Sequence, residues 1–221
     1  MKTEKIAEFV NRRENRFSGG EQHPAAFHSR SYHCFFEDWA EVQRTDENGH
    51  TKIERVYVGT WYIHPLQKIQ KALLLTGYFL GWLLSLALFI WGASQPFEIN
   101  SIWYVTIFEA AAAAALFWMF ISLFHYMAAP QKMTINSYRS SSSSLRNSAL
   151  TSAASLAVTS AATIIRTLIS LPDSDGKRWL CAASFLLSGI LCFIINQIEN
   201  RIQYNEELSD QIPPEGSSMI E

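Results

Sequence analysis

Four long apolar segments constrain the fold of this chain more than any other feature of its sequence. They occupy residues 72–93, 102–127, 148–170 and 179–198. Each has roughly the 20 residues that an α-helix needs to cross the hydrocarbon core of a bilayer. The sequence therefore predicts an α-helical polytopic membrane protein with four transmembrane helices, whose first partner is the lipid bilayer.

Lysine and arginine are distributed unevenly among the connections between these segments. The first connection, residues 94–101, contains neither, whereas residues 128–147 contain Lys132, Arg139 and Arg146 and no acidic residue. Cytoplasmic loops of membrane proteins carry an excess of these two residue types. We therefore expect residues 128–147 and both termini to lie in the cytoplasm, with the helices in the plasma (inner) membrane of a bacterial-type cell.

The region before the first apolar segment, residues 1–66, is predicted to fold as a small cytosolic α+β domain. It begins with a charged helix at 3–16 that lacks the apolar core of a signal peptide, so we expect no cleaved leader. Two strand-like runs then flank an Asn-Gly pair at 48–49, the strongest short signal for a β-hairpin. Residues 67–200 form the predicted four-helix domain. The acidic, proline-containing segment 201–221 is expected to be disordered.

A polar stripe runs along the third apolar segment. Its members recur every three or four residues and so share one face of an α-helix. They are Ser148, Ser152, Ser155, Thr159, Thr163, Arg166 and Ser170. In a bilayer this face must contact protein or water, because hydrocarbon offers hydroxyl groups and a guanidinium no partners. Two alternatives stay open: tight helix packing in a polar interior, which we favour, or the wetted lining of a pore biased toward anions by its arginine.

Glu109 and Arg166 are ionisable groups placed well inside the apolar segments. In the predicted topology they lie about 10 Å and about 8 Å from the same membrane boundary, at about 1.5 Å of helix rise per residue. Neither charge is stable alone in lipid. We therefore expect an intramembrane ion pair between the second and third helices. It would act as a static clamp or as part of a permeation path.

Other polar and small residues predict further contacts between the segments. Three polar residues near the inner ends of the second and fourth segments are expected to form a cluster: His125, Asn196 and Gln197. Gly77, Gly81 and Ser85 give the first segment a face of small residues, which is typical of close helix packing. By contrast, the five consecutive serines at 140–144 predict a solvated, flexible loop.

The sequence contains none of the common patterns of an enzyme active site, a nucleotide-binding loop or a metal site. Cys34, Cys181 and Cys192 do not have the spacing of metal ligands, and we expect reduced thiols. The net charge of −2 gives no basic field for nucleic acid. We therefore expect no enzyme activity, no cofactor and no metal.

Two classes of function remain. In the first, the chain is a membrane subunit that assembles through polar helix packing, as a homo-oligomer, and displays residues 1–66 to recruit or sense a cytosolic protein. In the second, it is an oligomeric ion channel or pore-forming effector in which the third helix lines the path. The sequence alone does not identify a transported species or a partner.

Overall fold

The computed structural model describes residues 38–45, 51–95, 102–169, 176–209 and 218–220. The chain divides into two compact units, Met1–Phe36 and Glu37–Glu221, and every described residue belongs to the second unit. This division falls well before the domain boundary predicted at residue 66. The helix predicted at 3–16 lies outside the described residues.

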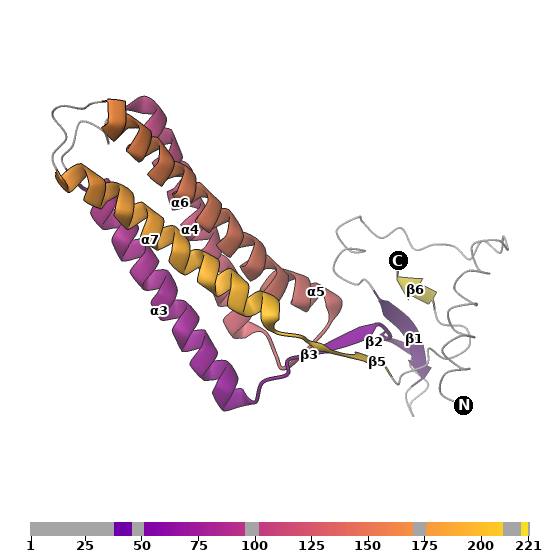
Figure 1. The fold of residues 1–221 in the computed structure, drawn as a ribbon. Helices are drawn as coiled ribbons and strands as arrows, with labels where there is room; N and C mark the ends of the chain where they lie inside the picture. The colour runs from indigo at the N-terminus through magenta and orange to yellow at the C-terminus, as the bar shows by residue number, and fades with distance from the viewer. Residues whose placement is uncertain (1–37, 46–50, 96–101, 170–175, 210–217, 221) are drawn as a thin grey trace. The chain divides into compact units, whose positions relative to one another are not determined.

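The described part of the chain is mostly helical. Its four longest helices are α3 (Lys68–Ala93), α4 (Trp103–Ala128), α6 (Ser144–Ile169) and α7 (Gly176–Arg201), each of 26 residues. They lie side by side, with α6 packed against both α4 and α7, and α7 also packed against α3 (Figure 1). All four are long and apolar enough to cross a membrane, as predicted.

The third helical segment begins earlier than predicted, because the serine run is helical. A short helix α5 (Ile135–Tyr138) continues through a π-helical turn η2 (Arg139–Ser143) directly into α6. Two of the serine hydroxyls bond backward along the chain: those of Ser140 and Ser141 both donate to the Ser137 carbonyl, at 3.2 Å and 2.6 Å. Such bonds let serine remain within a helix although it favours caps and turns. The predicted flexible loop at 140–144 is therefore wrong.

The hairpin predicted around residues 48–49 is present. Strands β1 (Trp39–Thr45) and β2 (Thr51–Tyr57) pair antiparallel, with Thr45 opposite Thr51. A third strand, β6 (Ser218–Ile220), pairs antiparallel with β1. The hairpin thus belongs to a sheet that includes the C-terminal end of the chain.

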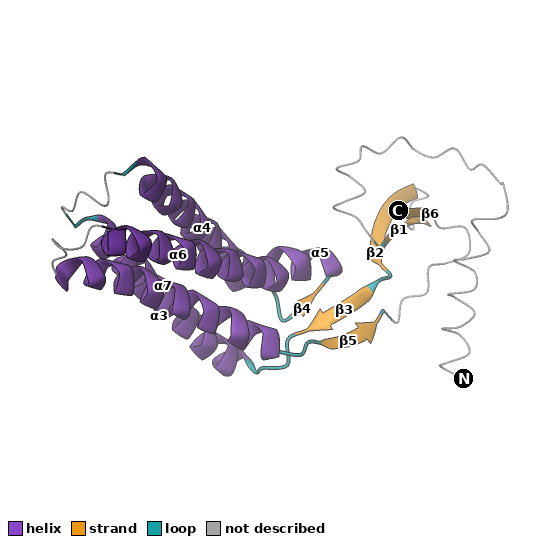
Figure 2. Cartoon of the chain, turned by 45° about the horizontal axis from the view of Figure 1, so that its top comes forward, coloured by secondary structure: helices purple, strands orange, loops and turns teal. Residues whose placement is uncertain are grey.

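A second sheet joins three helix ends. Strand β3 (Thr60–Ile63) lies between β4 (Lys132–Met133) and β5 (Asn205–Leu208). Because β3 precedes α3, β4 follows α4 and β5 follows α7, these helix ends meet at one end of the bundle (Figure 2). We call β4-β3-β5 the junction sheet. The disordered tail predicted from residue 201 is wrong for Asn205–Leu208 and Ser218–Ile220, because backbone pairing with earlier strands orders them.

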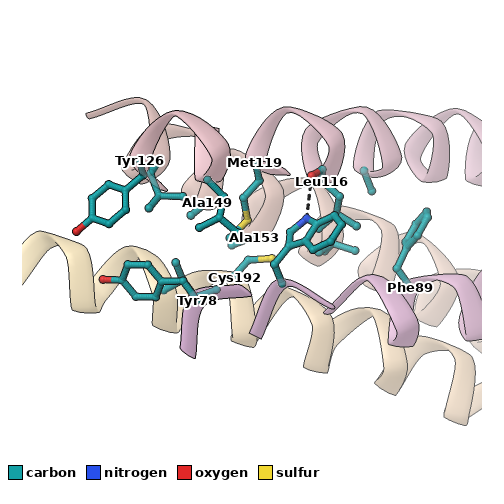
Figure 3. Packing of buried hydrophobic residues seen from close by; sticks show 14 of the residues in the cluster. Tyr78, Phe89, Leu116, Met119, Tyr126, Ala149, Ala153 and Cys192 are labelled. Carbon is teal, nitrogen blue, oxygen red and sulfur yellow. Dashed lines mark hydrogen bonds between the residues drawn. The ribbon is translucent and has the colours of Figure 1, made fainter. Parts of the chain in front are cut away.

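The core between the helices is rich in large side chains. Trp82 of α3 donates its indole N–H to the Leu116 carbonyl of α4 at 3.1 Å, the bond drawn as a dashed line beside Leu116 in Figure 3. The Trp82 ring stacks on Phe120. Leu156 of α6 and Phe185 of α7 are fully buried in the same cluster. Residues from all four helices therefore share one core.

Candidate functional site

The structure does not bring together the predicted inner polar cluster. His125 and Gln197 are exposed, whereas Asn196 is buried and donates its side-chain N–H to the Arg146 carbonyl at 2.9 Å. The neighbouring residue Tyr126 takes the inward position on α4. A shift of one residue turns a helical side chain by about 100°, so His125 points outward. The prediction of this cluster is wrong.

A different polar cluster lies at the same end of the bundle, centred on Glu199. This residue sits in the last turn of α7 and is 0% exposed. Its carboxylate accepts hydrogen bonds from three hydroxyl groups. Ser142 Oγ at 2.6 Å and the Tyr204 hydroxyl at 3.0 Å donate to Oε1, and the Tyr78 hydroxyl at 3.0 Å donates to Oε2. Charge-assisted bonds of this kind are the strongest in proteins.

These three donors come from separate parts of the chain. Ser142 belongs to the π-helical turn η2, Tyr78 to α3, and Tyr204 to the link between α7 and β5. A π-helical turn inside an α-helical segment often marks a functional position. The carboxylate therefore ties together α3, the start of α6 and both sides of the α7 terminus.

Aromatic rings surround this carboxylate. Tyr126 at the end of α4 lies next to Tyr78, with ring centroids 6.1 Å apart, and both hydroxyl groups point to the same end of the core (Figure 3). The Tyr126 hydroxyl is 2.9 Å from His64 Nε2, and the His64 ring lies 5.2 Å from that of Tyr204. We call these side chains the Glu199 cluster: Tyr78, Tyr126, Ser142, Glu199, Tyr204 and His64.

The Lys71 cation lies beside the Glu199 cluster. Lys71 Nζ donates to the Ala129 carbonyl at 2.9 Å and lies 5.7 Å from the centre of the Tyr126 ring. It also interacts electrostatically with Glu199. A buried carboxylate needs such compensation, because an isolated charge is costly in a low-dielectric interior.

The groups of the cluster outside the long helices have perturbed titration behaviour. Burial, and to a smaller extent the Lys71 cation, lowers the pKa of His64 from 6.5 to about 4. Burial and the negative charge of Glu199 raise the pKa of Tyr204. His64 is therefore neutral and Tyr204 is protonated at neutral pH. The site is a network of hydrogen-bonding groups built around one buried carboxylate.

The polar stripe of α6 faces the interior of the bundle. Ser148, Ser152, Thr159 and Thr163 are buried, Ser155 is half-buried, and Ser170 lies outside the described residues. Most of the stripe hydroxyls donate to carbonyls of their own helix; these bonds run from Ser148 to Leu145, from Thr159 to Ser155 and from Thr163 to Thr159. One residue not included in the predicted stripe, Ser160, donates across to the Ala182 carbonyl of α7 at 2.9 Å. This burial favours the packing alternative over the pore lining.

Glu109 and Arg166 are both half-buried but do not form an ion pair in the structure. Glu109 Oε1 and Arg166 Nε are buried without a hydrogen-bond partner. Electrostatically, Glu109 acts on Cys181 of α7. Matching depth fixes the height of two residues along the membrane normal, but not the direction in which each side chain leaves its helix.

The absence of this contact changes the expected behaviour of the two residues. We expect the destabilisation caused by Glu109→Gln and Arg166→Gln to add to within about 0.5 kcal/mol in the double variant, as for independent sites. Unfolding of the purified protein in detergent, monitored for the two single variants and the double variant, checks this. A double variant markedly more stable than the sum of the two single effects predicts would show that Glu109 and Arg166 form an ion pair after all.

The seam between α3 and α7 contains further polar contacts that the sequence indicated only in part. Ser85 Oγ lies 2.7 Å from Ser188 Oγ, and Ser188 Oγ donates to the Ser85 carbonyl at 2.9 Å. Gly81 faces Ile195, whereas Gly77 faces open space. The predicted small-residue face of α3 is thus a contact at Gly81 and Ser85 but not at Gly77.

Metal binding finds no support in the described ranges, where no three His, Cys, Asp or Glu side chains are grouped as ligands. Cys181 and Cys192 are buried free thiols, and Cys34 lies outside these ranges. Comparison of the chain with protein-family models, with curated proteins and with solved structures found no match. The geometry of the site alone therefore supports the functional conclusion.

Proposed function

We propose that this chain is an integral membrane subunit that crosses the plasma membrane four times and displays its junction sheet to a protein partner in the cytoplasm. One observation carries the proposal. Strands from three distant parts of the chain join the ends of α3, α4 and α7 in a single sheet at one end of the bundle. The junction sheet is thus attached directly to three of the four long helices.

The surface of the helices supports a lipid environment. Large apolar side chains are exposed on all four helices: Leu73, Phe117, Ile165 and Leu187 are 76%, 63%, 57% and 52% exposed. A soluble bundle would bury such a face, whereas lipid solvates it. The charge pattern supports the orientation, because Lys68, Lys132 and Arg201 are exposed at the junction end.

The outer strand of the junction sheet supports partner binding. All four residues of β5 are exposed, and among the described strands β5 pairs only with β3. An exposed strand edge is a template for an added strand from another chain. Glu206 and Glu207 lie on this strand, and Glu207 pairs with Lys132 at 3.6 Å. An extended segment with basic residues is the partner that complements this edge.

Membrane insertion and orientation are tested together by adding one exposed cysteine to a background in which Cys34 is replaced by serine and the other two cysteines, Cys181 and Cys192, are buried. Trp103→Cys and Glu207→Cys lie at opposite ends of the bundle and both positions are exposed. A membrane-impermeant maleimide should label Trp103→Cys in intact cells and Glu207→Cys only after permeabilisation. Extraction of the protein by alkaline carbonate would contradict insertion, and labelling in the reverse pattern would contradict the orientation.

Partner binding is tested with a photo-crosslinking amino acid in place of Leu208 of β5. The matched control is Leu187 in α7, which has similar exposure, 52% against 58%, but faces the proposed lipid. We expect a covalent protein adduct from position 208 and none from position 187. The same adducts at both positions, or no protein adduct at position 208, would refute display of the junction sheet to a partner.

A further inference from the structure

His64 occupies the link between the junction sheet and the helix bundle. It follows β3 directly and precedes Pro65 and the start of α3. The residue is 2% exposed, and its backbone N–H donates to the Gln131 carbonyl beside β4 at 3.0 Å. Both ring nitrogens are engaged: the Leu66 N–H donates to Nδ1 at 3.2 Å, and Nε2 lies 2.9 Å from the Tyr126 hydroxyl.

These two hydrogen bonds are compatible only with the neutral imidazole of His64. Because the Leu66 N–H points at Nδ1, that nitrogen must carry a lone pair, and the ring proton resides on Nε2. Nε2 then donates to the Tyr126 hydroxyl. A second proton would have to enter at Nδ1, where it would face the Leu66 N–H. Two donors cannot share a hydrogen bond, so the charged ring must rotate or the turn from His64 to Leu66 must open.

The groups around His64 do not compensate for a positive charge. Lys71 of α3 is itself a cation, and Tyr126 of α4 and Tyr204 beyond α7 are neutral phenols. The buried carboxylate of the cluster, Glu199, already accepts three hydroxyl donors and interacts with Lys71. Protonated His64 would therefore gain a neighbouring cation without gaining an anion of its own.

We propose that His64 is a proton-operated latch: neutral, it fastens β3 of the junction sheet to the start of α3, and protonated, it releases this connection. The latch works whether or not a protein partner binds the sheet. It converts acidification on the junction side into separation of the sheet from the bundle.

The low pKa of His64 agrees with this geometry and sets the direction of the response. The pKa is about 4 in the folded chain and 6.5 for an ordinary histidine. The opened link takes up a proton below 6.5, while the closed link does so only near 4. The closed form is therefore fully favoured above pH 6.5 and loses stability as the pH falls toward 4, by up to about tenfold per pH unit.

Hydrogen exchange of the full-length protein in detergent micelles tests the latch. The measured quantity is the protection factor of the Tyr62 and Ile63 amides, corrected for the intrinsic effect of pH on exchange. Between about pH 6.5 and about pH 4.5 we expect protection at β3 to fall by more than about tenfold, while the helix centres stay protected. Constant protection at β3 over this range would overturn the proposal.

Two variants separate His64 from the other groups that titrate nearby. His64→Asn retains an acceptor for the Leu66 N–H, and His64→Gln retains a side-chain N–H that reaches toward Tyr126. Neither titrates, so whichever folds with native helix content should show no acid-induced loss at β3. His125→Gln, at an exposed histidine, should retain the full response, as should Glu207→Gln, which removes the Lys132 ion pair. If the acid-induced loss of protection at β3 is unchanged in the His64 variants, or is abolished in Glu207→Gln, a group other than His64 causes it and the proposal is wrong.

Discussion

Glu199→Ala is expected to destabilise the folded protein by about 3 kcal/mol or more, since hydrogen bonds to a charged group contribute about 1.5–3 kcal/mol each. The substitution removes the common acceptor of Ser142, Tyr78 and Tyr204 at once. The buried hydroxyls of Ser142 and Tyr78 then have no carboxylate to bond. Removing one donor, as in Tyr78→Phe, leaves the other two bonds in place and should cost less.

Unfolding of the purified protein in detergent, followed by circular dichroism against temperature or added dodecyl sulfate, measures this loss. Gln197→Ala is the matched control, because Gln197 lies two residues away on the same helix but is exposed; we expect a change within about 0.5 kcal/mol. The double variant Glu199→Ala with Tyr78→Phe should be more stable than additivity predicts, by about 0.5 kcal/mol or more. Equal stability of Glu199→Ala and Gln197→Ala would refute a structural role for the cluster.

The four helices could be predicted from the sequence because their requirement is local. A helix that crosses a bilayer needs a continuous run of apolar residues, and such a run is visible without knowledge of any neighbour. The ends were less predictable. Lys68 and Lys71 precede the apolar segment at 72–93, but they lie in the first turn of α3, where Lys71 donates to the Ala129 carbonyl.

The Glu199 cluster could not be predicted in the same way, because its partners are distant in the sequence. Glu199 lies 57 residues from Ser142 and 121 residues from Tyr78. A carboxylate at the end of an apolar segment is usually solvated, and a serine run usually forms a loop. One signal was present: Glu199 continues the inward face of α7 from Cys192 and Ile195 at helical spacing, and both of those are buried.

The polar stripe shows what periodicity can establish and what it leaves open. Its spacing correctly placed Ser148, Ser152, Thr159 and Thr163 on one buried face of α6. The spacing does not specify the hydrogen-bond partner of each hydroxyl. In the structure most of the stripe hydroxyls bond their own helix, and Ser152 Oγ is buried without a partner. Because spacing also does not specify the direction of a side chain, it could not show that Glu109 and Arg166 do not contact each other.

Alanine substitution of two glycines on α3 should have different effects on the stability of the bundle. A Cβ atom at Gly92 would overlap the Ser184 hydroxyl of α7 and approach the Phe185 ring at 3.0 Å, whereas a Cβ atom at Gly77 meets nothing within 4 Å. We expect Gly92→Ala to destabilise the bundle by about 1–3 kcal/mol through overpacking. Gly77→Ala should be neutral or stabilising by up to about 1 kcal/mol, because alanine is the better helix former.

The contact at Gly92 has little freedom to relax. The Ser184 hydroxyl donates to the Cys181 carbonyl at 2.7 Å, and Phe185 packs against Phe89 one turn earlier in α3. Rotating the Ser184 side chain away would therefore break its hydrogen bond within α7, and shifting α7 away from α3 would loosen a buried aromatic pair. Detergent unfolding of both glycine variants measures the difference. Ser184→Gly in the Gly92→Ala background should restore part of the lost stability, because it removes the overlapping hydroxyl. Equal shifts at the two glycines, or no recovery with Ser184→Gly, would show that α3 and α7 do not approach closely at Gly92.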